Sequence, residues 1–378
     1  MFRFTITHKA KNCPARTGVI ETNHGFIETP AFVAVASSAS VKTLSPQEIT
    51  KSGTQIFFIN TFHLHLRPGE NIIKKFGGIH KFINWDGPII SDSGGFQIFS
   101  LSRDKEKNLV KIYEDHVELR SPWDGSKHFL TPQKSISIQK SLGADIIICL
   151  DDCTPYPVQY KTAKISLERT HRWAILSLEA YKKQKSTQAL YGVVQGSVFE
   201  SLRKKSAKFI SSLPFCGIAI GGVSVGESKE QMKKVLEWVI PLLPENKPRH
   251  LLGVGEIDDI FTLVQKGVDT FDCVMPTRLG RMGHILIKEY KSKKFSYDIT
   301  KIPYATDKRP LDPLCKCWVC KKFSRGYINH LFRTKELLGY RLATYHNLYF
   351  VNSLVKKIRE AIKGDRLEKL KEEWLGEE

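Results

Sequence analysis

Eight short apolar runs constrain the fold of this chain more than any other feature. Most of them end in small, polar or acidic residues. The runs lie at 31–36, 55–60, 88–92, 145–151, 190–195, 217–222, 250–254 and 268–274. Short runs that are apolar almost throughout are typical of strands buried on both faces, as in a parallel sheet.

Amphipathic segments with a helical pattern separate several of these runs. They lie at 132–142, 164–184, 200–213, 228–243 and 258–266. Strands that alternate with helices predict an α/β fold, and eight such strands predict a (β/α)8 TIM barrel. A doubly wound open sheet is the alternative. We favour the barrel because polar residues follow nearly every run, whereas an open sheet would concentrate them at one switch point.

The remaining segments do not fit the barrel pattern. Residues 1–8 alternate like a strand, and the polar segment 102–129 predicts an inserted hairpin or loop. Residues 283–297 predict a β-hairpin with a Lys-rich turn, and 327–363 form a basic segment with a helical pattern.

Three cysteines and a histidine near the C-terminus have the spacing of metal ligands. Cys315, Cys317 and Cys320 fall within six residues, and His346 follows 26 residues later. Three thiolates and one imidazole complete a tetrahedral zinc site and leave no coordination position open. We therefore predict one structural Zn²⁺, in a subdomain at about 283–350 that is inserted near the C-terminus of a single catalytic barrel domain, residues 1–378. Unligated cysteines on a loop are the alternative.

The charge balance makes an anionic partner the first hypothesis, and a basic proteome or a merely soluble surface is the alternative. The chain has 58 Lys+Arg and 39 Asp+Glu, a net charge of +19, which favours nucleic acid or an anionic membrane surface. No apolar run approaches the ~20 residues of a membrane span, and the N-terminus lacks a signal-peptide core. Dispersed cysteines without a secretion signal are usually reduced. We expect a cytoplasmic protein without a membrane partner.

Two carboxylates at strand ends form the catalytic hypothesis. Asp272 lies inside the last apolar run, and Asp92 ends the third. A buried charge is costly unless it is paired or functional. Two carboxylates at one barrel mouth can act as nucleophile and general acid/base at an anomeric carbon. Arg278 and Arg281, just beyond Asp272, predict an anionic group close by. A structural ion pair for Asp272 and a turn cap for Asp92 are the alternatives.

Polar groups after other strands can bind a planar base. Asp151, at the end of the fourth run, can accept hydrogen bonds from a ring N–H and an exocyclic amine, as guanine offers. Gln195 follows the fifth run and can donate to a carbonyl. The pair Gly221-Gly222 after the sixth run exposes backbone groups to a ligand. For Asp151, a role as the cap of the helix that follows is an equally good interpretation.

Taken together, these motifs closely resemble the bacterial form of the tRNA-guanine transglycosylase (queuine tRNA-ribosyltransferase) family over nearly the whole chain. The motifs that carry the resemblance are Asn60-Thr-Phe-His-Leu64, Leu66-Arg-Pro-Gly69, Ser91-Asp-Ser-Gly-Gly-Phe-Gln97, Asp124-Gly-Ser126, Val194-Gln-Gly-Ser-Val-Phe199, Gly221-Gly222, Phe271-Asp-Cys-Val274, Pro276-Thr-Arg278 and the zinc quartet. The resemblance implies a pentosyltransferase. It would exchange guanine at the wobble position of tRNAs with a G-U-N anticodon for 7-aminomethyl-7-deazaguanine, without a nucleotide or nicotinamide cofactor.

The resemblance also implies roles for individual residues. Asp272 would be the nucleophile that forms a covalent ribosyl-enzyme, and Asp92 the general acid/base. The residues implied to hold or sandwich the base are Asp151, Gln195, Gly222, Val223, Phe96 and Leu252. Asn60 and Gln97 would orient the carboxylates, and Arg278 and Arg281 would contact anticodon-loop phosphates.

Bacterial members of this family are homodimers that pack an aromatic patch beside the zinc site. Here Phe323, Tyr327 and His330 follow Cys320 at helical spacing and could form that patch. The alternative is that the three residues are the core face of their own helix.

Five positions depart from the family's usual pattern. Val223 stands where Leu is usual, Leu252 where Met is more common, and Phe62 where Tyr is usual. Glu256 occupies the position of a Lys near RNA, which puts that contact in doubt. Val225 replaces the Gly of eukaryotic relatives and favours the smaller bacterial substrate over queuine.

Two other functions are open. His63-Leu-His65 follows a strand and Asp272 ends another, as in a barrel metal-dependent hydrolase, but no His ends the middle strands. A non-catalytic tRNA-binding subunit is the second alternative, although such a subunit is expected to have lost the nucleophile.

Overall fold

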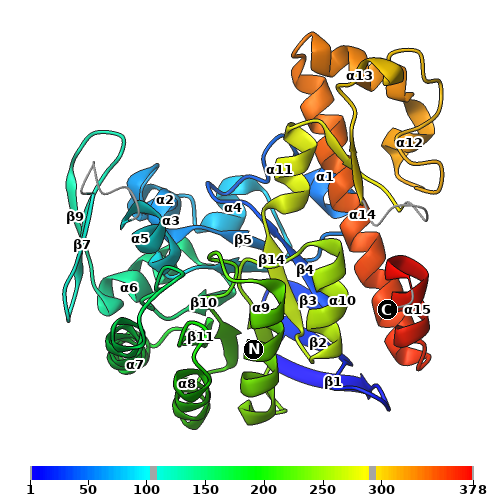
Figure 1. Ribbon diagram of the computed structural model, residues 1–378. Coiled ribbons are helices and arrows are strands. Elements are labelled where there is room, and N and C mark those ends of the chain that lie inside the picture. Colours follow the sequence, from blue (N-terminus) through cyan, green and yellow to red (C-terminus); the bar gives the residue numbers. More distant parts are fainter. Residues whose placement is uncertain (1, 103–108, 289–294, 377–378) are drawn as a thin grey trace.

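The computed structural model describes residues 2–102, 109–288 and 295–376. At its centre, eight parallel strands form a closed barrel, in which the last strand pairs with the first (Figure 1). In chain order these strands are β4 (Ala31–Val35), β5 (Phe57–Ile59), β6 (Ile89–Ser91), β10 (Ile146–Ile148), β11 (Ala189–Val194), β12 (Gly217–Ile220), β13 (Arg249–Leu251) and β14 (Thr270–Cys273). All eight apolar runs enter the barrel, so the TIM-barrel prediction is confirmed and the open sheet is excluded.

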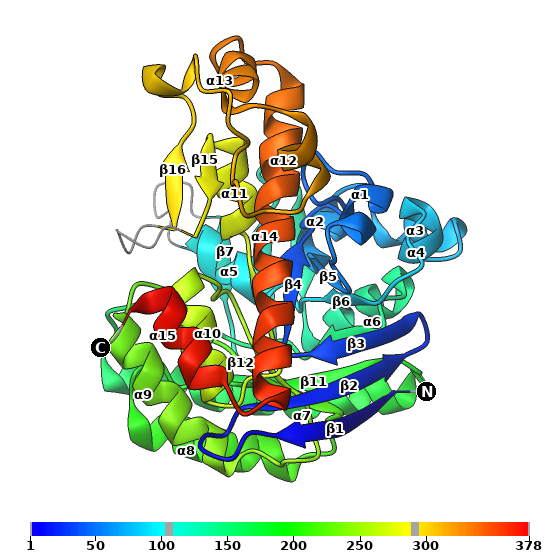
Figure 2. The same ribbon diagram turned by 90° about the vertical axis from the view of Figure 1, so that its right-hand side faces the viewer.

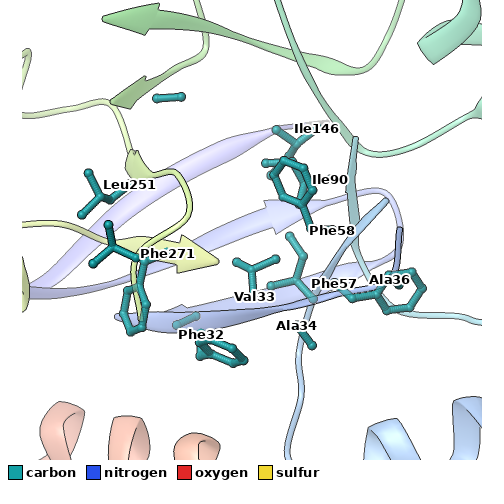
Figure 3. Close-up of a cluster of buried hydrophobic side chains, with 14 of the residues drawn as sticks. Phe32, Val33, Ala34, Ala36, Phe57, Phe58, Ile90, Ile146, Leu251 and Phe271 are labelled. Atoms are coloured by element: carbon teal, nitrogen blue, oxygen red, sulfur yellow. The ribbon is translucent and has the colours of Figure 1, made fainter. Parts of the chain in front are cut away.

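Most barrel strands are largely apolar, as expected for strands buried on both faces. Every residue of β5, β6, β10, β11 and β12 is buried. Figure 3 shows side chains of neighbouring strands packed together in this core, with the ring of Phe271 beside that of Phe32. Those two rings meet edge to face, with centroids 6.0 Å apart. This packing fixes the strands and therefore the positions of the residues that follow them.

Helices cover the outside of the barrel. Those on the first half are short: α1 (Pro46–Lys51), α2 (Thr61–Leu66), α3 (Glu70–Lys75), α4 (Ile79–Ile83) and α5 (Gly95–Ser102). The later ones are α6 (Pro132–Leu142), α7 (Tyr160–Lys183), α8 (Glu200–Ser212), α9 (Lys229–Val239), the 3-10 turn Ile240–Leu242 and α10 (Ile257–Gln265). The predicted limits of α6 are confirmed, since Thr131 caps its first turn and Gly143 ends it in the left-handed region.

An antiparallel sheet lies across the amino-terminal ends of the barrel strands (Figure 2). It consists of β1 (Arg3–Lys9), β2 (Arg16–Thr22) and β3 (Gly25–Thr29). Arg16 of β2 binds both carboxylate oxygens of Asp269, the residue before β14, at 2.8 and 2.6 Å. The sequence predicted only the first of these strands. A second sheet, β7 (Val110–Ile112), β8 (Val117–Arg120) and β9 (Lys127–Leu130), is the predicted insertion, of which 103–108 lie outside the described residues.

The C-terminal region extends beyond the barrel and returns along it. Its elements are α11 (Met275–Arg281), β15 (His284–Leu286), β16 (Ser296–Asp298), the 3-10 turn Ile302–Tyr304, α12 (Trp318–Lys322), α13 (Arg325–Arg333), α14 (Leu337–Lys363) and α15 (Leu367–Leu375). The long helix α14 runs from this region down the side of the barrel (Figure 2). The predicted Lys-rich turn of the hairpin, at 289–294, lies outside the described residues.

The segment predicted to be helical, 327–363, consists of two helices, α13 and α14. The chain turns between α13 and α14, where Lys335 has a φ of 59°, a value that interrupts a right-handed helix. Within the ranges that the structure describes, no helix is both long and apolar enough to cross a membrane.

Candidate active site

A cavity of about 510 Å³ opens at the carboxyl ends of the barrel strands. This end of a TIM barrel is where the βα loops meet and where active sites lie. The predicted residues that line the cavity are Asp92, Phe96, Asp151, Gln195, Gly222, Val223, Leu252, Asp272 and Arg278. Arg281 does not line it. The barrel therefore gathers residues that are far apart in the sequence around one space.

Asp272 lies on β14 with one carboxylate oxygen bound and the other free. Its Oδ1 accepts the N–H of Gly253 at 3.1 Å and contacts Nε2 of His250 at 3.2 Å. No described residue donates a hydrogen bond to Oδ2. The side chain is 12% exposed, and it borders the cavity. The ion pair considered for Asp272 is thus absent among the described Lys and Arg side chains, and His250 is its neighbour instead.

Asp92 follows β6 and is held by the start of α2. Its Oδ1 accepts the Thr61 N–H at 2.7 Å, and Oδ2 accepts a hydrogen bond from the Asn60 amide. Burial raises the pKa of Asp92 to about 7, and the neighbouring charges of Asp151 and Asp272 act in the same direction, while backbone N–H donors oppose them. A carboxyl group with this pKa can both donate and accept a proton near neutral pH.

Of the two amides expected to orient the carboxylates, one is hydrogen-bonded to a carboxylate and the other is not. Asn60 binds Asp92 directly and also accepts the His63 N–H at 2.9 Å. Gln97 lines the cavity but makes no hydrogen bond to Asp92 or Asp272, and its Oε1 is buried without a partner among the described residues. Its amide oxygen is thus a buried acceptor without a described donor.

Asp151 and Gln195 form a hydrogen-bonded pair at the floor of the cavity. Gln195 Nε2 donates to Asp151 Oδ2 at 2.7 Å, and Ser93 Oγ donates to Oδ1 at 3.2 Å. Burial raises the pKa of Asp151 to about 6, although the hydrogen bonds from Gln195 and Ser93 favour the carboxylate. At Gly222, where φ is +63°, a Cβ would lie 2.2 Å from Gln195 Oε1. Glycine there leaves room for the amide that faces the cavity.

Arg203 of α8 holds the loops that carry these groups, a role that the sequence did not reveal. Its guanidinium is fully buried and donates to the carbonyl oxygens of Val194, Ser197, Gly221 and Gly222 at 2.6–3.1 Å. Burial lowers the pKa of Arg203 to about 10, so it remains charged at neutral pH. One side chain thus fixes the loops after both β11 and β12.

Apolar side chains form the walls of the cavity. Phe96, at the start of α5, is 57% exposed, and Leu252, just after β13, is partly buried. Val223 is buried and Val225 also lines the space. An exposed aromatic ring beside buried polar groups is suited to stacking on a planar ligand.

The two predicted arginines lie on α11 and are free of acidic partners. Neither Arg278 nor Arg281 forms an ion pair with any residue that the structure describes. Arg281 Nη1 donates to the carbonyl oxygen of Thr277 at 2.8 Å, and burial together with the charge of Arg278 lowers the pKa of Arg281. Two cations without described counter-ions on one helix, one of them lining the cavity, favour a polyanionic partner.

The acidic residue Glu256 has a partner within the protein. Lys229 Nζ lies 2.7 Å from Glu256 Oε2 and also contacts Asp258 and Asp259. These contacts neutralise part of the negative charge at the edge of the cavity.

Cys315, Cys317, Cys320 and His346 converge as a candidate metal centre. All four ligand atoms lie within 4.8 Å of one another, and His346 Nδ1 is 3.6 Å from Cys317 Sγ and 3.3 Å from Cys320 Sγ. Ligands at Zn–S and Zn–N distances of about 2.3 and 2.1 Å in a tetrahedron are separated by about 3.6 Å. His346 Nε2 bonds the carbonyl oxygen of Leu286 at 2.8 Å, which leaves Nδ1 for the metal. The cluster is compatible with zinc.

The histidines of the hydrolase alternative do not reach the cavity. His65 binds Glu70 at 2.7 Å and His128 at 3.1 Å, and neither His63 nor His65 belongs to a metal-binding cluster among the described residues. Both lie on α2, and neither lines the cavity that contains Asp272, so they do not surround a metal together with Asp272. The hydrolase alternative is wrong.

Comparisons with known proteins agree with the geometry. The family model described as "Queuine tRNA-ribosyltransferase" matches residues 11–378. Curated relatives from several organisms carry the same name. The relative from Caldanaerobacter subterraneus subsp. tengcongensis is 49% identical over 99% of this chain and 96% of its own length. That from Halothermothrix orenii is 48% identical over 98% and 96%, and that from Lysinibacillus sphaericus 46% over 99% and 95%.

Proposed function

The chain belongs to the queuine tRNA-ribosyltransferase family of pentosyltransferases, and from this we propose that it exchanges guanine at the wobble position of G-U-N anticodons for 7-aminomethyl-7-deazaguanine. The observation that carries the proposal is the convergence of Asp92, Asp272 and the Asp151–Gln195 pair on one cavity. The proposed product is the precursor of queuosine in tRNA.

In the first step, we propose, Asp272 attacks the ribose of the wobble nucleotide. A bond forms between a carboxylate oxygen of Asp272 and C1′ while the C1′–N9 bond to guanine breaks. Guanine keeps the electron pair of that bond and takes a proton from Asp92. The pKa of Asp92, near 7, supports its role as the acid, and the absence of any described cation beside Asp272 leaves its negative charge available for attack.

In the second step the incoming base loses a proton to Asp92, and its ring nitrogen attacks C1′. The bond between Asp272 and C1′ then breaks, and the carboxylate is regenerated. Two inversions at C1′ give net retention of configuration. Because guanine departs before the second base reacts, the kinetics are those of a double displacement.

Base recognition rests on the cavity floor and walls. Asp151 accepts hydrogen bonds from the Watson–Crick edge of the base, Gln195 and the backbone at Gly222 and Val223 bind its carbonyl and its 7-substituent, and Phe96 and Leu252 enclose the ring. The side chain of Val225, which borders the same space, leaves less room than glycine would, and this supports the aminomethyl base over queuine.

The tRNA is held by charge and by the C-terminal region. Arg278 and Arg281 bind anticodon-loop phosphates, which are the counter-ions these residues lack within the described protein. The zinc bound by Cys315, Cys317, Cys320 and His346 is structural, since four protein ligands leave it no open position. Residues 1–378 act as one catalytic unit that includes the zinc-binding subdomain, in the cytoplasm, where tRNA is found.

We propose a homodimer through an aromatic patch beside the metal centre. Phe323 and Tyr327 stack with centroids 5.6 Å apart, and Tyr327 is 41% exposed. His330 is exposed on the same helix, so these residues are not simply its core face. Sedimentation of wild type and Tyr327→Ala tests this proposal: the variant is expected to dissociate at concentrations where the wild type is dimeric, and a monomeric wild type would contradict it.

Guanine exchange tests the proposed activity directly. Incubation with unmodified tRNA and labelled guanine is expected to place label at the wobble position, and 7-aminomethyl-7-deazaguanine is expected to compete better than queuine. A tRNA-binding subunit without activity would bind the tRNA but incorporate no label. Absence of label at stoichiometric enzyme would therefore refute the enzymatic proposal.

A further inference from the structure

His250 is a buried titratable side chain with no role in the steps described above. It lies on β13 with no exposed surface. Its Nδ1 contacts the Thr270 hydroxyl at 2.9 Å, and its Nε2 contacts Asp272 Oδ1 at 3.2 Å. The Phe58 ring stacks over the imidazole, with centroids 5.9 Å apart and planes inclined by 16°. Three neighbours therefore fix both the position and the plane of this ring.

The hydrogen-bond network determines which ring nitrogen carries the hydrogen. An ionised carboxylate only accepts hydrogen bonds, so Nε2 must be the donor to Asp272. In the neutral ring, Nδ1 is then an acceptor, and the Thr270 hydroxyl donates to it. Thr270 and Asp272 are both on β14. One strand therefore provides both the hydroxyl that fixes the tautomer of His250 and the carboxylate that accepts its hydrogen bond.

We propose that His250 is a positioning residue that selects Oδ2 of Asp272 as the attacking atom. Oδ1 receives two hydrogen bonds, from His250 and from the Gly253 N–H, whereas no described residue donates to Oδ2. A lone pair engaged with a donor is less nucleophilic, and two donors on one oxygen also fix the rotation of the carboxylate. Oδ2 therefore keeps its lone pairs free of described donors. Asp272 lines the cavity, so a ligand bound there can meet this oxygen.

This inference rests on the proposed function and makes its first step more specific. The bond that forms is Oδ2–C1′, the bond that breaks is C1′–N9, and the proton balance at Asp92 is unchanged. Throughout the reaction His250 keeps its hydrogen and remains bound to Oδ1. Its contribution is to the orientation of the nucleophile, not to proton transfer or to binding of tRNA.

Two variants separate the hydrogen bond from the shape of the ring. His250→Phe keeps an aromatic ring against Phe58 but has no donor, whereas His250→Gln keeps an amide N–H at a similar reach. Covalent complex formation with tRNA is measured in a single turnover, and KM for tRNA in the steady state. Thermal unfolding of each variant verifies that it is folded.

We expect His250→Phe to slow covalent complex formation by about tenfold to a hundredfold, as loss of a hydrogen bond to a charged group does, with KM for tRNA changed by less than about twofold. His250→Gln should restore the rate to within about threefold of wild type. A wild-type rate in His250→Phe would overturn the inference, and so would equal slowing in both variants. If wild-type enzyme formed no covalent complex, the proposed function itself would fail, a result distinct from either of these.

Discussion

Replacing Asp92 by asparagine should sharply reduce activity and make the variant's stability, relative to wild type, increase with pH, because the carboxyl group is buried. Its pKa is raised from 3.8 to about 7, chiefly because the ionised form is desolvated. A raised folded-state pKa means that the folded protein holds the proton more tightly than the unfolded chain. The contribution of this group to the free energy of unfolding is fully present below the pKa of the unfolded chain, and it is lost as the pH rises towards about 7.

The size of this change in the free energy of unfolding follows from the shift in the pKa of Asp92. About three pH units correspond to about 4 kcal/mol between the fully protonated and fully ionised limits. Part of this loss has already occurred at about pH 5, which is above the unfolded pKa, so about 2–3 kcal/mol remains between about pH 5 and about pH 8. Asparagine does not ionise. The free energy of unfolding of Asp92→Asn, relative to wild type, should therefore rise by that amount over this interval.

Urea unfolding of both proteins near pH 5 and near pH 8 measures the difference. The comparison across pH is informative because the altered hydrogen bonds to Asn60 and Thr61 contribute equally at both values. A stability difference that stays constant with pH would show that Asp92 is not the buried, proton-retaining group described here. Activity provides the second result: loss of a general acid/base should reduce exchange by about 10²–10⁴-fold.

Three further predictions concern the metal, the RNA and the cavity loops. Cys317→Ala should lower bound zinc and the unfolding temperature, measured by elemental analysis and calorimetry; unchanged metal content would refute the four-ligand site. Arg278→Ala should weaken tRNA binding and reduce, by about one, the number of ions released on binding, measured as the slope of log K against log salt concentration. An unchanged slope would place the phosphate contact elsewhere. Arg203→Met should lower the free energy of unfolding by about 3 kcal/mol or more, because at least three buried carbonyl groups lose their donor; a stability near wild type in urea would contradict this.

The sequence predicted the barrel correctly because most of its strands lie in short, largely apolar runs. That pattern is local, and so are the caps that delimit α6. The antiparallel strands β2 and β3 were not predicted because their stability depends on partners that are distant in the sequence. Arg16, for example, is buried only because Asp269 lies beside it, 253 residues away in the chain. The division between α13 and α14 also depends on one local turn at Lys335 that the helical pattern does not reveal.

The cavity could be predicted in outline for a related reason. In a TIM barrel, the carboxyl ends of the strands meet at one end. Asp92 and Asp151 end their apolar runs and Asp272 lies near the end of the last one, so the expectation that they share one barrel mouth agrees with the cavity. His250 and Arg203 were not foreseen. In the sequence, His250 is an ordinary strand residue, and Arg203 is one of several basic residues on an amphipathic helix. The partners of both residues are distant in the chain and become neighbours only in the folded structure.

The long helix α14 connects the candidate metal centre to α11, the helix that carries Arg278. His346, a candidate zinc ligand, is followed by Asn347, whose amide donates to the carbonyl oxygens of Pro276 and His284 at 3.0 and 2.9 Å. At Gly280 on α11, a Cβ would lie 2.7 Å from the backbone of Thr344. The two helices thus pack directly together, and a metal-stabilised α14 would hold the helix that carries Arg278.

The most direct test of the account is to locate the covalent bond. Wild-type enzyme is incubated with end-labelled tRNA and no incoming base, denatured, digested and mapped by mass spectrometry. We predict an adduct that survives denaturation, is attached to Asp272, and is absent from Asp272→Ala. An adduct that persists in Asp272→Ala, or one that maps to Asp92, would contradict the assignment of the nucleophile.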